Sequence, residues 1–157
     1  MTEKIFRIYL DNCCYNRPYD DQAQIRISLE TQAKIFIPNG VRCDKIELAT
    51  SCVLRHENNK NAYATQRSAS ADFMEKHTAV FVDFDKIAEI KKIAEEIMST
   101  SVKEVDTAHI TCAILAECNY FLTTDHRVLR YCSDKIKIMN PIEFLKVLEV
   151  TQNVQHD

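Results

Sequence analysis

The chain has 157 residues, of which 46% are hydrophobic and 27% are charged, and its formal net charge is −3. This length and composition are typical of one soluble globular domain with a hydrophobic core. The charge excludes the overall basic footprint of nonspecific nucleic-acid binding, although a divided surface can hide behind the sum. The first apolar run stops at Leu10, too short for a signal peptide or a membrane span, so we expect a cytoplasmic protein without membrane contact.

Five short apolar runs predict β-strands, at residues 5–10, 45–50, 79–82, 120–123 and 136–139. Helical patterns separate these strands. The first helix is expected from Asp20 or Asp21 to about residue 36, where Pro38-Asn39-Gly40 would end it and turn the chain. Ser51 is placed to cap the next helix. Further helices are expected to about residue 75, over residues 84–98, from Asp106 and from Pro141.

Strands that alternate with helices predict a parallel sheet covered on both faces. We therefore expect an α/β protein, a three-layer α/β/α sandwich with a five-stranded parallel sheet. Residues 1–150 would form its single domain, and residues 151–157 a polar C-terminal tail. The seven cysteines are odd in number, lack any Cys-x-x-Cys pair and lie in apolar runs, so we predict reduced, buried thiols rather than disulfides or zinc ligands.

Acidic residues stand near the ends of these strands. Asp11 comes directly after the first strand, and Asp125 comes just after the fourth. Because the carboxyl ends of parallel strands share one edge of the sheet, these two carboxylates can meet if their strands are neighbours. Glu57 lies nearly two turns into the helix that follows Ser51 and can reach the same edge. Asp106 can join them only if its helix begins over that edge.

Each acid also has a simpler explanation, since a helix cap or turn residue at such a position is worth about 0.5–2 kcal/mol. Glu57 alone would be a solvated helix residue. Convergence is costly, because two carboxylates about 4 Å apart repel by about 4 kcal/mol at an effective dielectric of roughly 20. Four of them make sense mainly around a bound cation, and oxygen ligands select Mg²⁺ or Mn²⁺. Such a site can activate water for attack on phosphorus.

Four segments of the chain resemble the motifs of the PIN domain family, the metal-dependent ribonucleases that include VapC-type toxins of toxin–antitoxin pairs. They are Tyr9-Leu10-Asp11-Asn12, Ser51 with Glu57, Asp106-Thr107-Ala108-His109-Ile110 and Leu122-Thr123-Thr124-Asp125. The segment Cys13-Cys14-Tyr15-Asn16-Arg17-Pro18, followed by Asp20-Asp21-Gln22, resembles the loop of a bacterial subgroup. Each motif is short, but their order and spacing cover nearly the whole chain.

The resemblance implies a five-stranded parallel sheet and hydrolysis of RNA phosphodiesters with Mg²⁺ or Mn²⁺. The implied metal ligands are the four acids Asp11, Glu57, Asp106 and Asp125. The resemblance also implies homodimers and, in many members, a small antitoxin protein that blocks the site. Glu57 departs from the family pattern because no apolar residue follows it, and Glu47 in the second strand is the alternative acid.

Several other residues have two interpretations each. Asn12, Ser51 and Thr123 could donate hydrogen bonds that hold the ligand carboxylates, or they could be turn and cap residues. Arg17 could bind a substrate phosphate through two hydrogen bonds, or it could be a surface arginine. His109 shares a helix face with Asp106, and we interpret it as a packed histidine rather than a ligand or base.

The leading hypothesis is therefore a divalent-metal-dependent endoribonuclease. The alternative is a PIN-like module that binds a protein or RNA without cutting it. A different acid-rich α/β phosphohydrolase would need a nucleophilic aspartate with a second aspartate two residues later, and Asp11-Asn12-Cys13 does not supply that pair.

Overall fold

The computed structural model describes residues 5–16, 25–98 and 104–156. Its centre is a five-stranded, fully parallel sheet with the strand order β3-β2-β1-β4-β5. The strands are β1 (Phe6–Leu10), β2 (Ile46–Ser51), β3 (Thr78–Val82), β4 (Tyr120–Leu122) and β5 (Lys137–Met139). The predicted strands are confirmed, with bounds that differ by at most one residue at either end.

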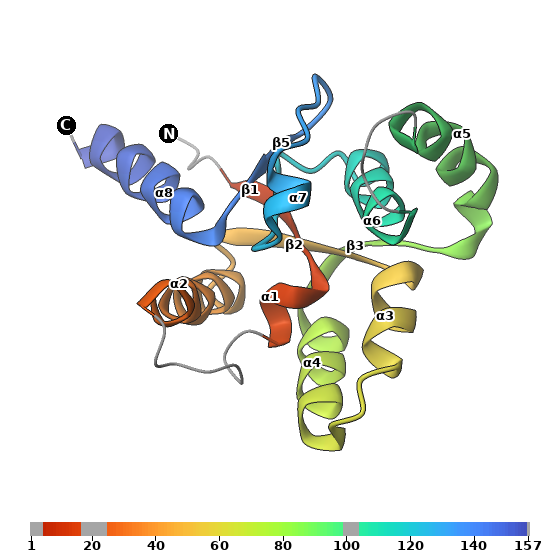
Figure 1. Ribbon diagram of the computed structural model, residues 1–157. Coiled ribbons are helices and arrows are strands. Elements are labelled where there is room, and N and C mark those ends of the chain that lie inside the picture. The colour runs from red at the N-terminus through yellow and green to blue at the C-terminus, as the bar shows by residue number, and fades with distance from the viewer. Residues whose placement is uncertain (1–4, 17–24, 99–103, 157) are drawn as a thin grey trace.

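Helices cover both faces of the sheet, as expected for a three-layer α/β/α sandwich (Figure 1). The helices are α1 (Asn12–Asn16), α2 (Ile25–Arg42), α3 (Cys52–Asn59), α4 (Ala64–His77), the short 3₁₀ helix η2 (Phe84–Lys86), α5 (Ile87–Met98), α6 (Glu104–Leu115), α7 (His126–Leu129) and α8 (Pro141–His156). Helices α2 and α8 pack against each other on one side, and α5 and α6 pack against each other on the other.

The side chains of β1 separate the two cores, because successive residues of a strand point to opposite faces. Ile8 and Leu10 are buried in the core under α2 and α8, with Phe144 of α8. Tyr9 is buried in the opposite core, with Ile110 of α6. The central strand is therefore covered on both faces by these two cores.

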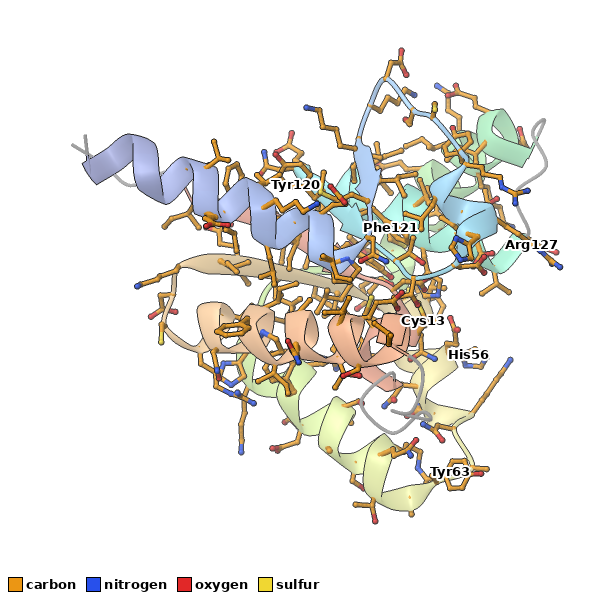
Figure 2. The ribbon with its side chains drawn as sticks, turned by 60° about the vertical axis from the view of Figure 1, so that its left-hand side comes forward. Cys13, His56, Tyr63, Tyr120, Phe121 and Arg127 are labelled. Carbon is orange, nitrogen blue, oxygen red and sulfur yellow. The ribbon has the colours of Figure 1, made fainter. Side chains whose placement is uncertain are left out.

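The strand order places a topological switch beside β1. The chain builds β2 and β3 on one side of β1 and then crosses to form β4 and β5 on the other. Ligands of open α/β sheets bind outside the carboxyl ends of the strands at such a point. Cys13, after β1, and Arg127, in α7, lie toward the same end of the molecule in Figure 2.

The predicted end of α2 is wrong, because Pro38 and Gly40 lie inside the helix. Continuing the helix buries Val41 in the core, which outweighs the weak helix propensity of the segment. Gly40 serves close packing rather than a turn, since a Cβ atom there would lie 2.6 Å from the Cδ1 atom of Ile46. The chain turns instead at Asp44, whose φ is 57°.

The remaining expectations from the sequence concern the C-terminal tail, the start of α2, the cysteines and membrane spans. Helix α8 includes residues 151–156, which were assigned to a polar tail. The start expected for α2, at Asp20 or Asp21, lies outside the described residues. All seven cysteines are described, and none of them forms a disulfide; Cys43 and Cys132 are exposed rather than buried. Among the described helices, none is both long enough and apolar enough to cross a membrane.

Candidate functional site

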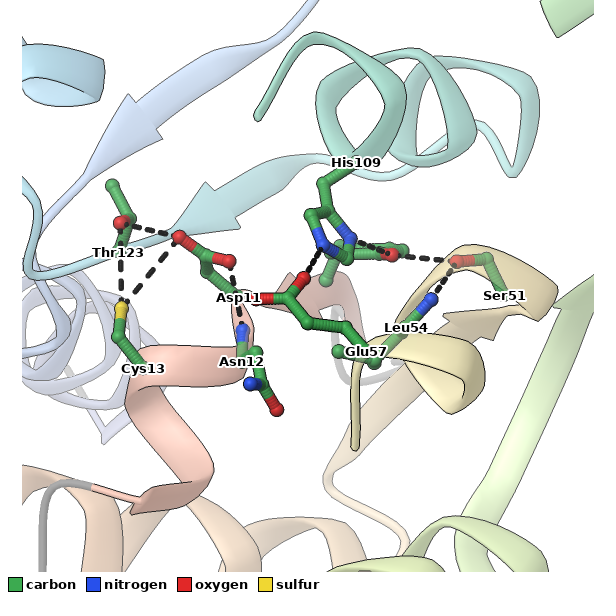
Figure 3. A network of polar contacts seen from close by, with 9 residues as sticks. Asp11, Asn12, Cys13, Ser51, Leu54, Glu57, His109 and Thr123 are labelled. Atoms are coloured by element: carbon green, nitrogen blue, oxygen red, sulfur yellow. Dashed lines mark hydrogen bonds and ion pairs between the residues drawn. The ribbon is translucent and has the colours of Figure 1, made fainter. Parts of the chain in front are cut away.

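Asp11 is the centre of the polar site at the carboxyl edge. It follows the central strand directly and is only 6% exposed. Its Oδ1 accepts a hydrogen bond of 2.8 Å from the backbone N–H of Asn12, and its Oδ2 accepts one of 2.9 Å from the hydroxyl of Thr123. The thiol of Cys13 contacts the same Oδ2 at 3.6 Å. These contacts fix the buried carboxylate in one orientation (Figure 3).

Thr123 connects the ends of the two neighbouring strands β1 and β4. Besides donating to Asp11, its Oγ1 accepts a hydrogen bond of 3.1 Å from the backbone N–H of Asp125. Asp125 caps α7 by accepting a hydrogen bond of 2.8 Å from the N–H of Arg127 on Oδ1. The capping interpretation is thus correct for Asp125, and the cap holds its carboxylate beside the end of β4.

Asp106 lies in the first turn of α6, which leads into β4 and therefore begins over the carboxyl edge. Its pKa is raised, first by burial and then by the negative charges of Asp11 and Asp125. Such an effect on the pKa of Asp106 requires that the other two carboxylates lie near it. The condition set by the sequence for Asp106, that its helix begin over the shared edge, is met.

Glu57 is held by His109. The side chain of Glu57 is 34% exposed, whereas that of His109 is 1% exposed. The Nε2 atom of His109 contacts Oε2 of Glu57 directly. The other carboxylate oxygen of Glu57 is turned toward Asp11 in Figure 3.

A continuous chain of hydrogen bonds extends from His109 to the start of α3. The Nδ1 atom of His109 lies 2.7 Å from the hydroxyl of Tyr9, and that hydroxyl lies 2.7 Å from Oγ of Ser51. Ser51 in turn accepts a hydrogen bond of 3.0 Å from the backbone N–H of Leu54, which caps α3. An ionised carboxylate can only accept, so Nε2 of His109 carries the proton that Glu57 binds.

The charges of the site also move the pKa values of this pair. Burial alone lowers the pKa of His109, but the hydrogen bond with Glu57 and the negative charges around it, Asp11 foremost, give a net rise. Burial raises the pKa of Glu57, but the hydrogen bond and charge of His109, with a smaller contribution from Asn12, give a net decrease. The pair is therefore stabilised in its ionised form.

Glu47, the alternative acid from the sequence, lies elsewhere. Glu47 pairs with Arg7 through a 2.9 Å ion pair, and the two residues are register partners on adjacent strands. Because Arg7 stands near the amino end of β1, Glu47 lies away from the edge that carries Asp11. Arg17 lies outside the described residues.

Within the described residues, no group of three or more His, Cys, Asp or Glu side chains is arranged closely enough to enclose a metal ion. The charges of Asp11 and Asp125 raise the pKa of Asp106, but the described carboxylates do not form a closed ligand set. The sequence did not predict two features of the polar network: the hydrogen bonds of Tyr9 and the contact between His109 and Glu57. The available signal was the spacing of His109 and Asp106 on one helix face.

The parallel sheet, its helical layers and its strand order define a PIN-like α/β fold. FitAcB from Neisseria gonorrhoeae has this fold, with a TM-score of 0.55, 14% identity, and coverage of 85% of this chain and 97% of that chain. VapBC2 from Rickettsia felis, bound to a DNA fragment from the VapBC2 promoter, gives a TM-score of 0.52 and 11% identity, with coverage of 85% of this chain and 98% of that chain. FitAB bound to an IR36 DNA fragment gives a TM-score of 0.52, 14% identity, and coverage of 86% and 95%.

No protein-family model and no curated protein sequence matches the chain. At identities of 11–14%, the likeness to these solved structures establishes the fold and leaves the chemistry to be argued from the residues.

The substitution Thr123→Val tests the link between the two strand ends. It leaves the buried Oδ2 of Asp11 without its hydroxyl donor and the N–H of Asp125 without its acceptor, so we expect a loss of about 1–3 kcal/mol in the free energy of unfolding. The control is Thr111→Val, since the buried Thr111 hydroxyl donates to the carbonyl of Thr107 within α6, and its loss should cost less. Urea unfolding measures both, and equal losses would contradict the link.

The Glu57–His109 pair predicts a pH-dependent stability. The raised pKa of His109 stabilises the fold below the unfolded value of about 6.5, and this contribution is lost as the pH rises through the folded value. The lowered pKa of Glu57 stabilises the fold above about 4.3, and that contribution is lost as the pH falls through the folded value. Thermal melting should therefore separate wild type from Glu57→Gln most between about pH 4.3 and 6.5.

The control for this comparison is Glu143→Gln, because Glu143 is exposed and pairs with Lys146, which is also exposed. Its effect on the melting temperature should be small at every pH. A melting difference between wild type and Glu57→Gln that stays constant across the pH series would contradict the coupling.

Proposed function

We propose that this protein is a Mg²⁺- or Mn²⁺-dependent endoribonuclease that hydrolyses RNA phosphodiesters at the carboxyl edge of its sheet. The residues proposed to hold the ion are Asp11, Glu57, Asp106 and Asp125. The observation that carries the proposal is geometric: Asp11 ends β1, Asp125 caps the helix after the neighbouring strand β4, and Asp106 stands in the first turn of the helix that leads into β4. The raised pKa of Asp106, caused first by burial and then by the charges of Asp11 and Asp125, agrees with this placement, and a cation would relieve the repulsion.

The donor set fits a hard divalent ion. All four proposed ligands are carboxylates, which favour Mg²⁺ and Mn²⁺ over softer metals. Mg²⁺ keeps several waters and is usually bound through one or two carboxylates together with substrate phosphate oxygens. An open arrangement of acids, rather than a closed cage, is therefore compatible with such an ion.

Each residue of the proposed site would have a separate role. Thr123 and the N–H of Asn12 hold Asp11 in place, and the cap of α7 holds Asp125. When bound, the ion would supply a more acidic water and stabilise the charge that develops on phosphate oxygens. Hydrolysis would add a water oxygen to phosphorus, break the bond from phosphorus to the leaving oxygen, and leave a proton on that leaving oxygen.

The likeness to FitAcB and VapBC2, together with the motifs shared with VapC-type proteins, supports a further proposal about biological setting. We propose that the chain is the toxin of a toxin–antitoxin pair, that it forms a homodimer, and that a small antitoxin protein binds it. Copurification of a small protein encoded beside it would test this proposal.

A non-catalytic PIN-like module that binds protein or RNA is the second candidate. It is favoured by one observation: the described acids do not enclose an ion. Binding of Mn²⁺ or RNA by the pure protein without any cleavage of varied RNAs would select this candidate.

The substitution Asp125→Asn separates the two roles of Asp125. Asparagine caps a helix as well as aspartate does, so α7 should remain intact while the charge is lost. If Asp125 helps to bind an ion worth about 3 kcal/mol to the transition state, the rate of Mn²⁺-dependent RNA cleavage should fall by about 100-fold. Asp11→Asn should reduce the rate at least as much.

The matched control is Asp83→Asn. Asp83 also caps a short helix by accepting from a backbone N–H, but it is exposed and follows β3 at the outer edge of the sheet. Cleavage by this variant should equal that of wild type. Cleavage that survives Asp125→Asn and Asp11→Asn, or that does not depend on Mn²⁺ or Mg²⁺, would contradict the proposed nuclease.

A further inference from the structure

His109 occupies an unusual position for a buried histidine. Its side chain is 1% exposed, yet both ring nitrogens contact polar side chains rather than backbone. Those two side chains come from different elements, Tyr9 from β1 and Glu57 from α3. The ring therefore connects the central strand to the helix that carries one of the four acids.

The hydrogen bonds form a closed circuit through α3. Ser51 stands at the start of this helix and Glu57 lies in its second turn. Tyr9 and His109 join these two positions from outside the helix. Because α3 is fixed at two points, the carboxylate of Glu57 is fixed relative to β1 and hence relative to Asp11.

The circuit uses only one oxygen of Glu57. Oε2 contacts His109, and the other oxygen is turned toward Asp11 (Figure 3). A free glutamate side chain loses rotamer entropy when it becomes ordered. A glutamate already held through one oxygen avoids most of that loss when a ligand reaches the other.

We infer that His109 is a positioning residue that holds Glu57 so that one of its carboxylate oxygens faces the site where a divalent cation would bind. This inference rests on the proposed function for the identity of the ion. Tyr9 and Ser51 support His109 from behind and do not touch the acids. Hydrogen-bonded partners of this kind commonly orient carboxylate ligands, and their loss weakens metal binding by about 10- to 100-fold.

The test measures Mn²⁺ affinity of the intact protein by electron paramagnetic resonance at one fixed pH. The variant His109→Leu fills the buried site but cannot donate to Glu57, so its dissociation constant for Mn²⁺ should rise by about 10- to 100-fold. His109→Gln places an amide N–H where it can donate to Glu57, and it should restore most of the affinity. Tyr9→Phe leaves the contact of His109 with Glu57 in place, so it should weaken Mn²⁺ binding less than His109→Leu.

A double-mutant cycle separates positioning from general stability. In a Glu57→Gln background, His109→Leu should not weaken Mn²⁺ binding further, because the histidine acts through the carboxylate that is now absent. Thr111→Val is the stability control, since Thr111 lies on the same helix and is also fully buried. It should leave the Mn²⁺ affinity unchanged whatever it does to the melting temperature.

Three results would overturn the inference. They are unchanged affinity in His109→Leu, equal weakening by the leucine and glutamine variants, and additive losses in the cycle. If His109→Leu does not fold, the Mn²⁺ affinities of His109→Gln, Tyr9→Phe and Glu57→Gln decide in its place. A larger loss of Mn²⁺ affinity in Tyr9→Phe than in Glu57→Gln would contradict the positioning role. RNA cleavage is recorded separately, so Mn²⁺ binding that depends on His109 without any cleavage would reject the nuclease and keep the inference.

Discussion

Negative charge concentrated at the carboxyl edge of the sheet is the constraint on which the polar architecture of this protein depends. Asp11, Asp106 and Asp125 come from β1, α6 and the start of α7, and the first and last of them raise the pKa of Asp106. Folding brings these carboxylates together because β1 and β4 are hydrogen-bonded neighbours and α6 leads into β4. The fold therefore accepts an electrostatic cost at one point of its surface, as functional sites commonly do.

The surrounding donors limit that cost without removing it. Thr123 and the N–H of Asn12 satisfy both oxygens of Asp11, and the cap of α7 uses one oxygen of Asp125. His109 adds a proton donor to Glu57. Each donor holds its carboxylate in place as well as stabilising it, so the apo protein already contains an ordered set of oxygens.

The sheet could be predicted from the sequence because its strands are short apolar runs that end at polar residues. Asp11 ends β1 and Asp125 follows β4 at the positions where the pattern changes. The end of α2 could not be predicted, because local propensity favours a stop at Pro38, whereas burial of Val41 and the contact of Gly40 with Ile46 depend on the position of β2.

The candidate site, like the fold, could be predicted from the sequence only in part. Acids at strand ends were visible in the sequence because their positions follow from the parallel sheet. The choice between Glu57 and Glu47 was not visible, because it depends on register: Glu47 lies opposite Arg7, which occupies it. The link from Ser51 through Tyr9 to His109 joins residues far apart in the chain, and only the packing of α6 on β1 brings them together.

The most direct measurement of the central claim is the anomalous scattering of Mn²⁺ in crystals soaked with that ion. The account predicts a peak among the carboxylates of Asp11, Asp106 and Asp125, within reach of the oxygen of Glu57 that His109 does not hold. Mn²⁺ bound elsewhere on the protein, with no peak among these acids, would contradict it.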